Sequence, residues 1–210
     1  NPLTPIQLTI DNLKSKYLDD IEENKKEKYI FNLKTINKQI KQIENLVNEF
    51  SDFARMPKPL FKNNNLIDII KANILLLNKF DEEIKINFEN IDKKIILSSD
   101  NEQIGRVFFN LIKNSIESIH EKAKKTPNIN KIINIEITEG SDYINVNIID
   151  SGIGFSKINV KELTKPYFTT KEKGTGLGLS IVNKIINDHN GSIKFENLQD
   201  GAKVEIFFQK

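Results

Sequence analysis

The sequence contains no cysteine, so disulfides, thiolate zinc sites and cysteine nucleophiles are excluded. This absence fits a protein of a reducing cytosol. Long apolar runs are missing as well: none approaches the roughly 20 residues that a membrane helix needs, and no signal peptide opens the chain. We therefore expect no membrane contact by this chain.

Charge of one sign is also lacking. The 31 basic and 29 acidic residues give a formal net charge of +2, which provides no overall field for nucleic acid, and we expect no nucleic-acid partner. The 38% of hydrophobic residues is ordinary for a soluble protein with a real core.

Two helices are predicted in the first 55 residues, because apolar residues recur at steps of three and four along Leu3, Ile6, Ile10, Leu13 and Tyr17, and again along Leu33, Ile36, Ile40, Ile43, Val47 and Phe50. The nearly all-charged residues 19–28 predict a solvated turn between them, as in an antiparallel hairpin. Two helices bury too little surface alone, so we expect an identical chain to complete a four-helix bundle. Packing of the hairpin on its own downstream domain is the alternative.

A domain boundary is predicted at Met56-Pro57-Lys58-Pro59, since proline lacks an amide proton and biases its predecessor away from helical angles. We assign residues 1–57 to the helical hairpin and residues 58–210 to a second domain. In the second domain we expect helices at residues 66–80, 100–122 and 179–189, and a loop at residues 63–65. Strands are expected at residues 84–88, 94–98, 131–138, 143–149, 192–196 and 203–208. Strands interleaved with helices predict one α/β layer pair.

The helix at residues 100–122 carries a polar stripe, because Gln103, Asn110, Asn114 and Glu117 are spaced to share one face. The packing face comprises Ile104, Phe108, Leu111, Ile112, Ser115 and Ile119. Asparagine is a poor helix former, so two of them one turn apart need a reason beyond solvation. A carboxamide oxygen is a suitable neutral ligand for Mg2+. A plain solvent-facing surface is the alternative interpretation.

The strand at residues 143–149 runs into Asp150-Ser151-Gly152-Ile153-Gly154. Its two glycines allow a tight turn and a close approach to a planar ligand, with the carboxylate free to accept an amino hydrogen bond. A simple turn would give the same pattern.

The glycine-rich run Gly174-Thr175-Gly176-Leu177-Gly178-Leu179 leads directly into a helix, whose free amide donors attract phosphate. Its three alternate glycines predict a mobile lid. The spacing excludes a P-loop and does not fit a GxGxxG turn after a strand. Lys171 and Lys173 are candidate charge partners for phosphates, although such lysines are as often merely solvent-facing.

Four segments, taken in order, resemble the nucleotide-binding boxes of bacterial sensor histidine kinases. The N box is Asn110-Leu-Ile-Lys-Asn114, the first G box Asp150-Ser-Gly-Ile-Gly154, the F box Pro166-Tyr-Phe-Thr-Thr-Lys171, and the second G box residues 174–179. The sequences Thr169-Thr170-Lys171 and Ser180-Ile181-Val182 are most similar to those of the nitrogen-regulation sensors of the NtrB and NtrY type.

The resemblance implies an α+β chain with an N-terminal antiparallel helical hairpin, half of a dimeric four-helix bundle, followed by a Bergerat-type α/β sandwich ATP-binding domain. It implies ATP and Mg2+ as cofactors, with Asn114 binding the metal, Asn110 assisting and Asp150 contacting the adenine amino group. ATP contacts are implied at Asn110, Lys113, Asn114, Asp150, Gly152, Gly154, Phe168, Thr169, Lys171, Lys173, Gly174, Thr175, Gly176, Leu177, Gly178 and Leu179.

The first residues, Asn1-Pro2-Leu3-Thr4, resemble the end of the family's phosphoacceptor box, which would put the acceptor histidine and its adjacent acid upstream of Asn1. We therefore expect no self-phosphorylation by this chain. Asn1 itself matches a position that often aids dephosphorylation of the partner. For the two histidines present, His120 and His189, we expect structural or surface roles near helix ends.

The family reaction is ATP-dependent phosphorylation of a histidine, followed by transfer to an aspartate of a response regulator. The resemblance thus implies a protein-histidine kinase, a homodimer through the hairpin, and a response regulator receiver domain as partner. It also implies the cytoplasmic portion of a protein attached to the bacterial inner membrane. Two alternatives remain: an ATP hydrolase of the gyrase, Hsp90 or mismatch-repair kind, and a non-catalytic nucleotide-binding dimeric scaffold. Those hydrolases use a carboxylate as general base where this chain has Asn110.

Overall fold

The computed structural model describes residues 3–79, 81–89, 92–126, 128–155, 162–169, 171 and 174–210. Contacts divide the chain into two compact units, Asn1–Met56 and Pro57–Lys210. The functions assigned to the two parts of the chain stay predictions. Among the described residues, none of the helices is both long and apolar enough to cross a membrane.

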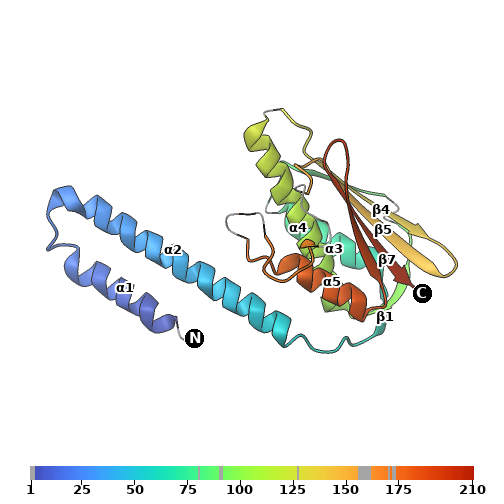
Figure 1. Ribbon diagram of the computed structural model, residues 1–210, viewed down its shortest axis with the longest axis horizontal. Coiled ribbons are helices and arrows are strands. Elements are labelled where there is room, and N and C mark those ends of the chain that lie inside the picture. Colours follow the sequence, from blue (N-terminus) through green and yellow to red (C-terminus); the bar gives the residue numbers. More distant parts are fainter. Residues whose placement is uncertain are drawn as a thin grey trace. The chain divides into compact units, whose positions relative to one another are not determined.

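The first unit is an antiparallel hairpin of two helices, α1 (Thr4–Tyr17) and α2 (Glu23–Ala54) (Figure 1). Its core consists of Ile10, Leu33 and Ile40, with Leu3 and Tyr29 packed against them. The Tyr29 hydroxyl donates a hydrogen bond to the Leu13 carbonyl at 3.1 Å and so ties the two helices together. A proline lies in the first turn of α1, and α2 ends just before Met56-Pro57, as predicted.

The turn between the helices is shorter than the prediction for residues 19–28, because α2 already begins at Glu23. Glutamate and lysine are good helix formers, and opposite charges three residues apart stabilise a helical turn. Glu22 pairs with Lys25 at 2.6 Å, and Glu23 pairs with Lys26 at 2.7 Å. The charged run therefore forms the start of a helix instead of a loop.

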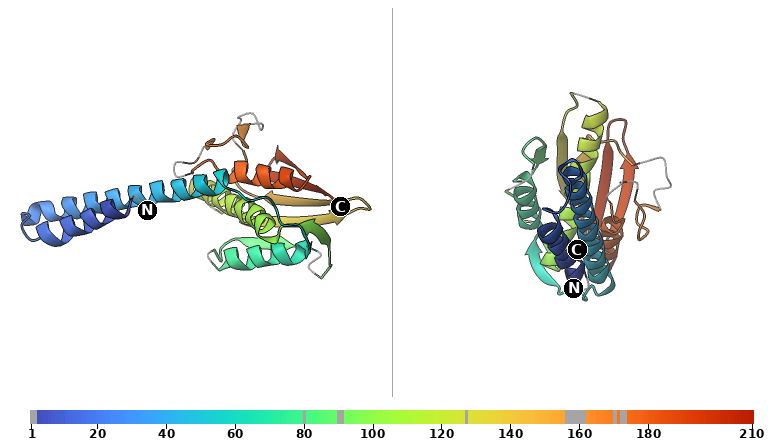
Figure 2. Two further views of the ribbon diagram at one scale, coloured as in Figure 1. Left: turned by 90° about the horizontal axis from the view of Figure 1, so that it is seen from below. Right: turned by 90° about the vertical axis from the view of Figure 1, so that its left-hand side faces the viewer.

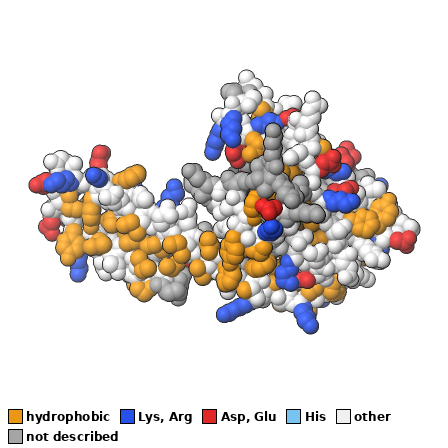
Figure 3. Space-filling model, viewed as in Figure 1, with side chains coloured by type: hydrophobic (Ala, Val, Ile, Leu, Met, Phe, Trp, Pro, Cys, Tyr) orange, Lys and Arg blue, Asp and Glu red, His pale blue; other side chains and the backbone are white. Residues whose placement is uncertain are grey.

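Most of the predicted seam of the hairpin lies on its surface within a single chain. Figure 3 shows hydrophobic side chains gathered along these helices. The exposed members of the predicted seam, together with neighbouring apolar residues, are Ile6, Leu8, Leu13, Tyr17, Phe31, Ile36, Ile43, Leu46, Val47 and Phe50. So long a row of exposed apolar side chains is typical of an interaction surface.

The second unit is a mixed α/β structure around a five-stranded sheet with the order β2-β4-β5-β7-β6. The strands are β2 (Lys85–Phe88), β4 (Ile132–Glu139), β5 (Tyr143–Asp150), β6 (Ser192–Asn197) and β7 (Ala202–Gln209). Only the pairing of β2 with β4 is parallel; the other three are antiparallel. A separate two-stranded sheet pairs β1 (Lys62–Asn65) with β3 (Ile96–Ser99).

Three helices, α3 (Leu66–Asn78), α4 (Asn101–Lys125) and α5 (Gly178–Asp188), cover one face of the large sheet (Figures 1 and 2). As predicted, Ile144, Val146 and Ile148 alternate onto one buried face of β5. The predicted packing face of α4 is buried with them. The predicted α/β layer pair is thus confirmed.

One local prediction for the second unit is wrong, and one predicted helix is longer than expected. Residues 63–65 form strand β1 instead of a loop, although asparagine has a low strand propensity. The Asn64 carboxamide donates to the Ser99 carbonyl at 2.6 Å, and the Asn65 carboxamide accepts from the Ile95 amide at 3.1 Å, which stabilises the pairing. Helix α4 continues to Lys125 because lysines in its last turn complement the helix dipole.

The two histidines have structural contacts. His189, at the end of α5, is buried; its Nδ1 lies 2.8 Å from the Ile185 carbonyl, and its Nε2 accepts from the Asp100 amide at 3.0 Å. Asp100 in turn caps α4 by accepting from two amides of its first turn. His120 pairs with the Asp81 carboxylate. His189 therefore links the end of α5 to the start of α4.

Candidate functional site

One wall of helix α4 carries the two carboxamides that the sequence singled out. Asn110 Nδ2 donates to the Arg106 carbonyl one turn earlier at 2.8 Å, so its Oδ1 is oriented away from the helix backbone. A Cβ on Gly178, the first residue of α5, would lie 3.3 Å from that Oδ1. The beginning of α5 therefore approaches α4 closely at Asn110. No side chain caps this end of α5, and its first amide groups remain suitable donors for an anion.

Asp150 ends β5 and points into the layer between sheet and helices, with 6% of its surface exposed. Its carboxylate accepts from the Ser115 hydroxyl of α4 at 3.1 Å and from the Gly152 amide at 2.9 Å. Burial raises the pKa of this carboxyl group above its ordinary value, although these two hydrogen bonds, the Ala202 amide and the nearby Lys122 act in the opposite direction. A buried carboxylate of this kind favours a ligand that offers N–H donors.

The backbone after Asp150 is packed so closely that two of its positions require glycine. A Cβ on Gly152 would lie 2.1 Å from the Ser118 hydroxyl oxygen. Gly154 has a φ of 75°, which side-chain-bearing residues rarely adopt. The end of β6 holds the same segment, since the Asn197 carboxamide accepts from the Phe155 amide at 2.6 Å and donates to the Phe155 carbonyl at 3.0 Å.

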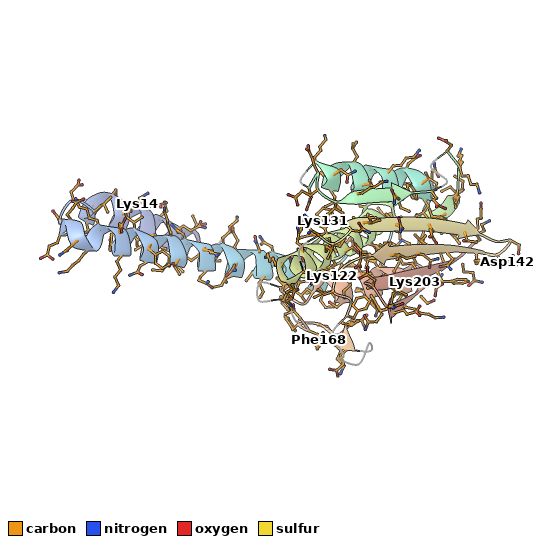
Figure 4. The ribbon with its side chains drawn as sticks, turned by 90° about the horizontal axis from the view of Figure 1, so that it is seen from above. Lys14, Lys122, Lys131, Asp142, Phe168 and Lys203 are labelled. Atoms are coloured by element: carbon orange, nitrogen blue, oxygen red, sulfur yellow. The ribbon has the colours of Figure 1, made fainter. Side chains whose placement is uncertain are left out.

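A further contact anchors this turn to α4. Lys122 (Figure 4) donates to the Ser151 carbonyl at 3.0 Å and forms an ion pair with Asp200, between β6 and β7. The Asp150–Gly154 loop is therefore held from two sides.

The segment before α5 contains the predicted F box and glycine-rich run; its Phe168 is labelled in Figure 4. The Thr169 hydroxyl accepts from the Lys171 amide at 3.1 Å, and the Thr175 hydroxyl accepts from the Leu177 amide at 3.4 Å. Gly174 passes close to Thr169, and Leu177 is fully buried as the anchor of α5. Leu179 follows in the first turn of that helix.

Lys171 lies against the same wall of α4. Its ammonium donates to Asn114 Oδ1 at 3.0 Å and pairs with the carboxylate of Glu117. Lys113, largely exposed, lies 3.9 Å from the other oxygen of Glu117. The segment before α5 and the N-box residues of α4 are thus brought together, as are α4 and Asp150.

Two predicted site residues, Asn1 and Lys173, lie outside the described residues. The prediction that Gln103 shares the polar stripe of α4 is wrong. Gln103 is buried, and its Nε2 donates to the Pro57 carbonyl at 3.0 Å. Its side chain therefore binds the backbone at Pro57 and does not extend the polar stripe.

Sequence reasoning missed several residues of this arrangement, namely Ser115 as a partner of Asp150, Glu117 as the partner of two lysines, Ser118, Lys122 and Asn197. Ser115 carried a signal, because it is the one hydroxyl within an otherwise apolar helix face. The Ser118 hydroxyl accepts from the Ile153 amide at 3.1 Å.

Comparison with known proteins agrees with this geometry. Residues 99–210 match the family described as histidine kinase-, DNA gyrase B- and HSP90-like ATPase. An NtrY-like sensor histidine kinase of Rickettsia felis is 35% identical over 209 residues, covering 99% of this chain and 34% of the relative. Nitrogen regulation protein NtrY of Azorhizobium caulinodans is 34% identical over 203 residues, covering 96% of this chain and 26% of the relative. The chain thus spans about a quarter to a third of the length of these relatives.

Solved structures show the same architecture. The histidine kinase ThkA, in a complex with the response regulator protein TrrA, superposes with a TM-score of 0.69 at 25% identity, covering 100% of this chain and 58% of that chain. The catalytic domain of ThkA alone gives a TM-score of 0.59 at 28% identity, covering 72% of this chain and 96% of that chain.

The chain therefore belongs to the family of histidine kinase-, DNA gyrase B- and HSP90-like ATPases. Within that family it groups with the bacterial sensor histidine kinases of the NtrY type, as the resemblance in its sequence predicted. The predicted fold class, α+β with N-terminal helices and a Bergerat-type sandwich, is confirmed as well.

Proposed function

We propose that this chain is the dimerisation and ATP-binding core of a sensor histidine kinase. Its full-length protein would transfer the γ-phosphoryl group of ATP to a histidine and then to an aspartate of a response regulator. The observation that carries the proposal is the meeting of three segments with neighbouring residues of α4: Asp150 at Ser115, Lys171 at Asn114, and the start of α5 at Asn110. A protein that positions a nucleotide triphosphate needs such a convergence of donors, acceptors and cations.

The proposed residue roles follow from these surroundings. Asp150 would accept a hydrogen bond from the adenine amino group, because its carboxylate is buried and already fixed by neighbouring donors. The uncapped amides at the start of α5 and the lysines nearby would bind the phosphates. The glycine-rich run would close over them as a lid.

The residues present fit a bound Mg2+. Asn114 Oδ1 already holds a cation, the ammonium of Lys171, and Mg2+ takes few protein ligands when phosphates and water supply the rest. The described residues contain no cluster of three or more histidine, cysteine, aspartate or glutamate side chains able to hold a metal without nucleotide. When bound, the ion would neutralise phosphate charge; Asn114 would be its protein ligand, with Asn110 assisting.

The nucleotide site is tested by isothermal titration calorimetry with Mg-ATP. We expect Asn114→Ala to weaken binding by about tenfold or more, because a charge-assisted ligand contact is lost. Asn73→Ala is the matched control, since Asn73 is also a mid-helix asparagine but donates to the Ile69 carbonyl of its own helix. Equal weakening by both substitutions, or no binding by the unaltered chain, would refute the proposal.

Phosphoryl transfer is tested separately with radiolabelled ATP. His189 is buried with both ring nitrogens engaged, and His120 is paired with Asp81, so we expect neither histidine to become labelled. Phosphoryl transfer should be observed when a second chain that carries the family's acceptor histidine is added, with the label on that histidine. ThkA in its complex with TrrA supports a response regulator as the further partner of the full-length protein.

The hydrolase alternative is disfavoured by Asn110. A carboxamide cannot take a proton at neutral pH, and its Nδ2 is committed to the Arg106 carbonyl. A hydrolase would release phosphate steadily without any histidine acceptor, whereas we expect release from this chain to stay at the level of the Asn114→Ala variant.

A further inference from the structure

Three side chains, Lys171, Asn114 and Glu117, meet at α4. The Lys171 ammonium donates to Asn114 Oδ1 at 3.0 Å and also pairs with the Glu117 carboxylate. Asn114 and Glu117 stand three residues apart on the helix, so their oxygens face the same point. We call the pair formed by Asn114 Oδ1 and the Glu117 carboxylate the cation seat.

The seat offers what a hard divalent cation requires. A carboxylate oxygen and a carboxamide oxygen are both ligands of Mg2+ and Mn2+. The ammonium of Lys171 is bound by the same two groups, which shows that the seat accepts positive charge. An ammonium and a divalent ion cannot share the two oxygens, because they repel each other at contact distance. One must leave when the other arrives.

We propose that Lys171 and the nucleotide-borne divalent cation exchange at this seat. Without nucleotide, Glu117 and Asn114 hold Lys171 and with it the segment before α5 against α4. When the metal nucleotide arrives, the ion takes the seat and the released ammonium turns to the phosphates. Glu117 is thereby a positioning residue for Lys171 and a further oxygen ligand for the ion. This inference rests on the proposed function, since it assigns a device to the same site.

An ordinary surface ion pair would behave differently. The side chains of Lys171 and Glu117 are 34% and 41% exposed, and pairs with such exposure contribute little to stability. Removing the lysine of an ordinary pair would leave nucleotide binding unchanged. Removing a competitor from a cation seat has two effects of opposite sign: metal alone binds more tightly, and metal nucleotide binds more weakly because a phosphate partner is lost.

The test measures Mn2+ binding to the nucleotide-free chain by electron paramagnetic resonance, and Mn-ATP binding by calorimetry. For Lys171→Gln we expect Mn2+ alone to bind about fivefold more tightly, the size of an exposed ion-pair effect. We expect Mn-ATP to bind about tenfold more weakly, because a charged phosphate contact disappears. Lys165→Gln is the control: it removes the same charge from the same segment, and the Lys165 ammonium pairs with Glu162 at 2.8 Å.

A second variant changes the cation seat itself and leaves Lys171 in place. Glu117→Gln should weaken Mn2+ binding without nucleotide, and thermal unfolding should show that both variants remain folded. The exchange is refuted if Lys171→Gln leaves the affinity for Mn2+ alone unchanged or lowers it, or if Lys165→Gln has the same effects. If the Mn2+ results are as expected but the unaltered chain binds no ATP, the proposed function fails while the cation seat stands.

Discussion

At the scale of single residues, Asp150 occupies a buried position with several fixed partners. Its carboxylate is buried beneath α4, and burial raises its pKa in spite of the donors around it. Because the pKa in the folded chain lies above that in the unfolded chain, the group's contribution to stability is present at low pH and is lost as pH rises through the folded pKa. The ionised form of the carboxylate therefore opposes folding, as expected for a residue kept for binding.

Replacing this carboxylate should separate binding from stability. Asp150→Asn should weaken Mg-ATP binding on the order of tenfold to a hundredfold, since hydrogen bonds to charged groups are the strong ones. Its thermal midpoint at neutral pH should not fall below that of the unaltered chain. Calorimetric titration and thermal unfolding measure the two effects. Asp142→Asn is the control, because Asp142 lies in the exposed turn between β4 and β5 (Figure 4).

The same carboxylate should make nucleotide binding sensitive to acid. As pH falls toward the raised pKa of Asp150, protonation removes the charge that accepts the adenine amino group, so the affinity of the unaltered chain should fall. Asp150→Asn should lack this part of the pH dependence. If Asp150→Asn binds Mg-ATP as tightly as the unaltered chain at neutral pH, the role given to Asp150 is contradicted.

At the scale of elements, the turn that leads into α5 depends on the backbone conformation at Gly176. Gly176 has a φ of 71°, and a Cβ there would lie 2.5 Å from the Tyr167 carbonyl carbon. Tyr167 itself has a φ of 65°. The turn that leads into α5 therefore depends on one residue without a side chain, and the amides at the start of α5 depend on that turn.

Gly176→Ala should accordingly impair both the turn and the site. The left-handed conformation alone costs about 1–2 kcal/mol for an alanine, and the contact with Tyr167 adds to this. We expect a lower free energy of unfolding in urea and weaker Mg-ATP binding. Gly105→Ala is the opposite case: it lies within α4, its Cβ would have its nearest neighbour at 3.8 Å, and a helical alanine should stabilise by about 0.5–1 kcal/mol. Equal stability of the two variants would contradict this account of the turn.

At the scale of the whole molecule, the two units differ in how they bury apolar surface. The α/β unit buries its sheet and helices within one chain. Among the described residues of the hairpin, Ile10, Leu33 and Ile40 are buried, while most of its predicted seam stays exposed. A helical hairpin with such a surface is expected to pair with a second copy, which supports the proposed four-helix bundle.

Charge placed on that surface should weaken dimerisation. We expect Ile36→Lys combined with Ile43→Lys to weaken self-association by at least about tenfold, because charges would be buried in an apolar interface. Sedimentation equilibrium measures the dissociation constant. Gln39→Lys, which adds a positive charge at an exposed position of the same helix, should leave it unchanged. If the double variant associates as tightly as the unaltered chain, the hairpin is not the dimer interface.

Much of the fold could be predicted because its signals are local. The period of apolar residues located α1, α2, α4 and β5, and prolines located the end of α2. The errors at β1 and Gln103 have one cause: strand β1 exists through its pairing with β3, and Gln103 is buried because its side chain meets the Pro57 carbonyl. Neither partner is adjacent in the sequence.

By itself, the sequence determined the order of the helices and of every strand but β1, the family and most of the residues proposed to bind ATP, since periodicity and box spacing depend on near neighbours. The tertiary structure alone decided which side chains meet. Ser115 reaches Asp150 across 35 residues, and Lys171 reaches Glu117 across 54. Such contacts depend on how a sheet and its helices pack in three dimensions, which no local pattern of residues encodes.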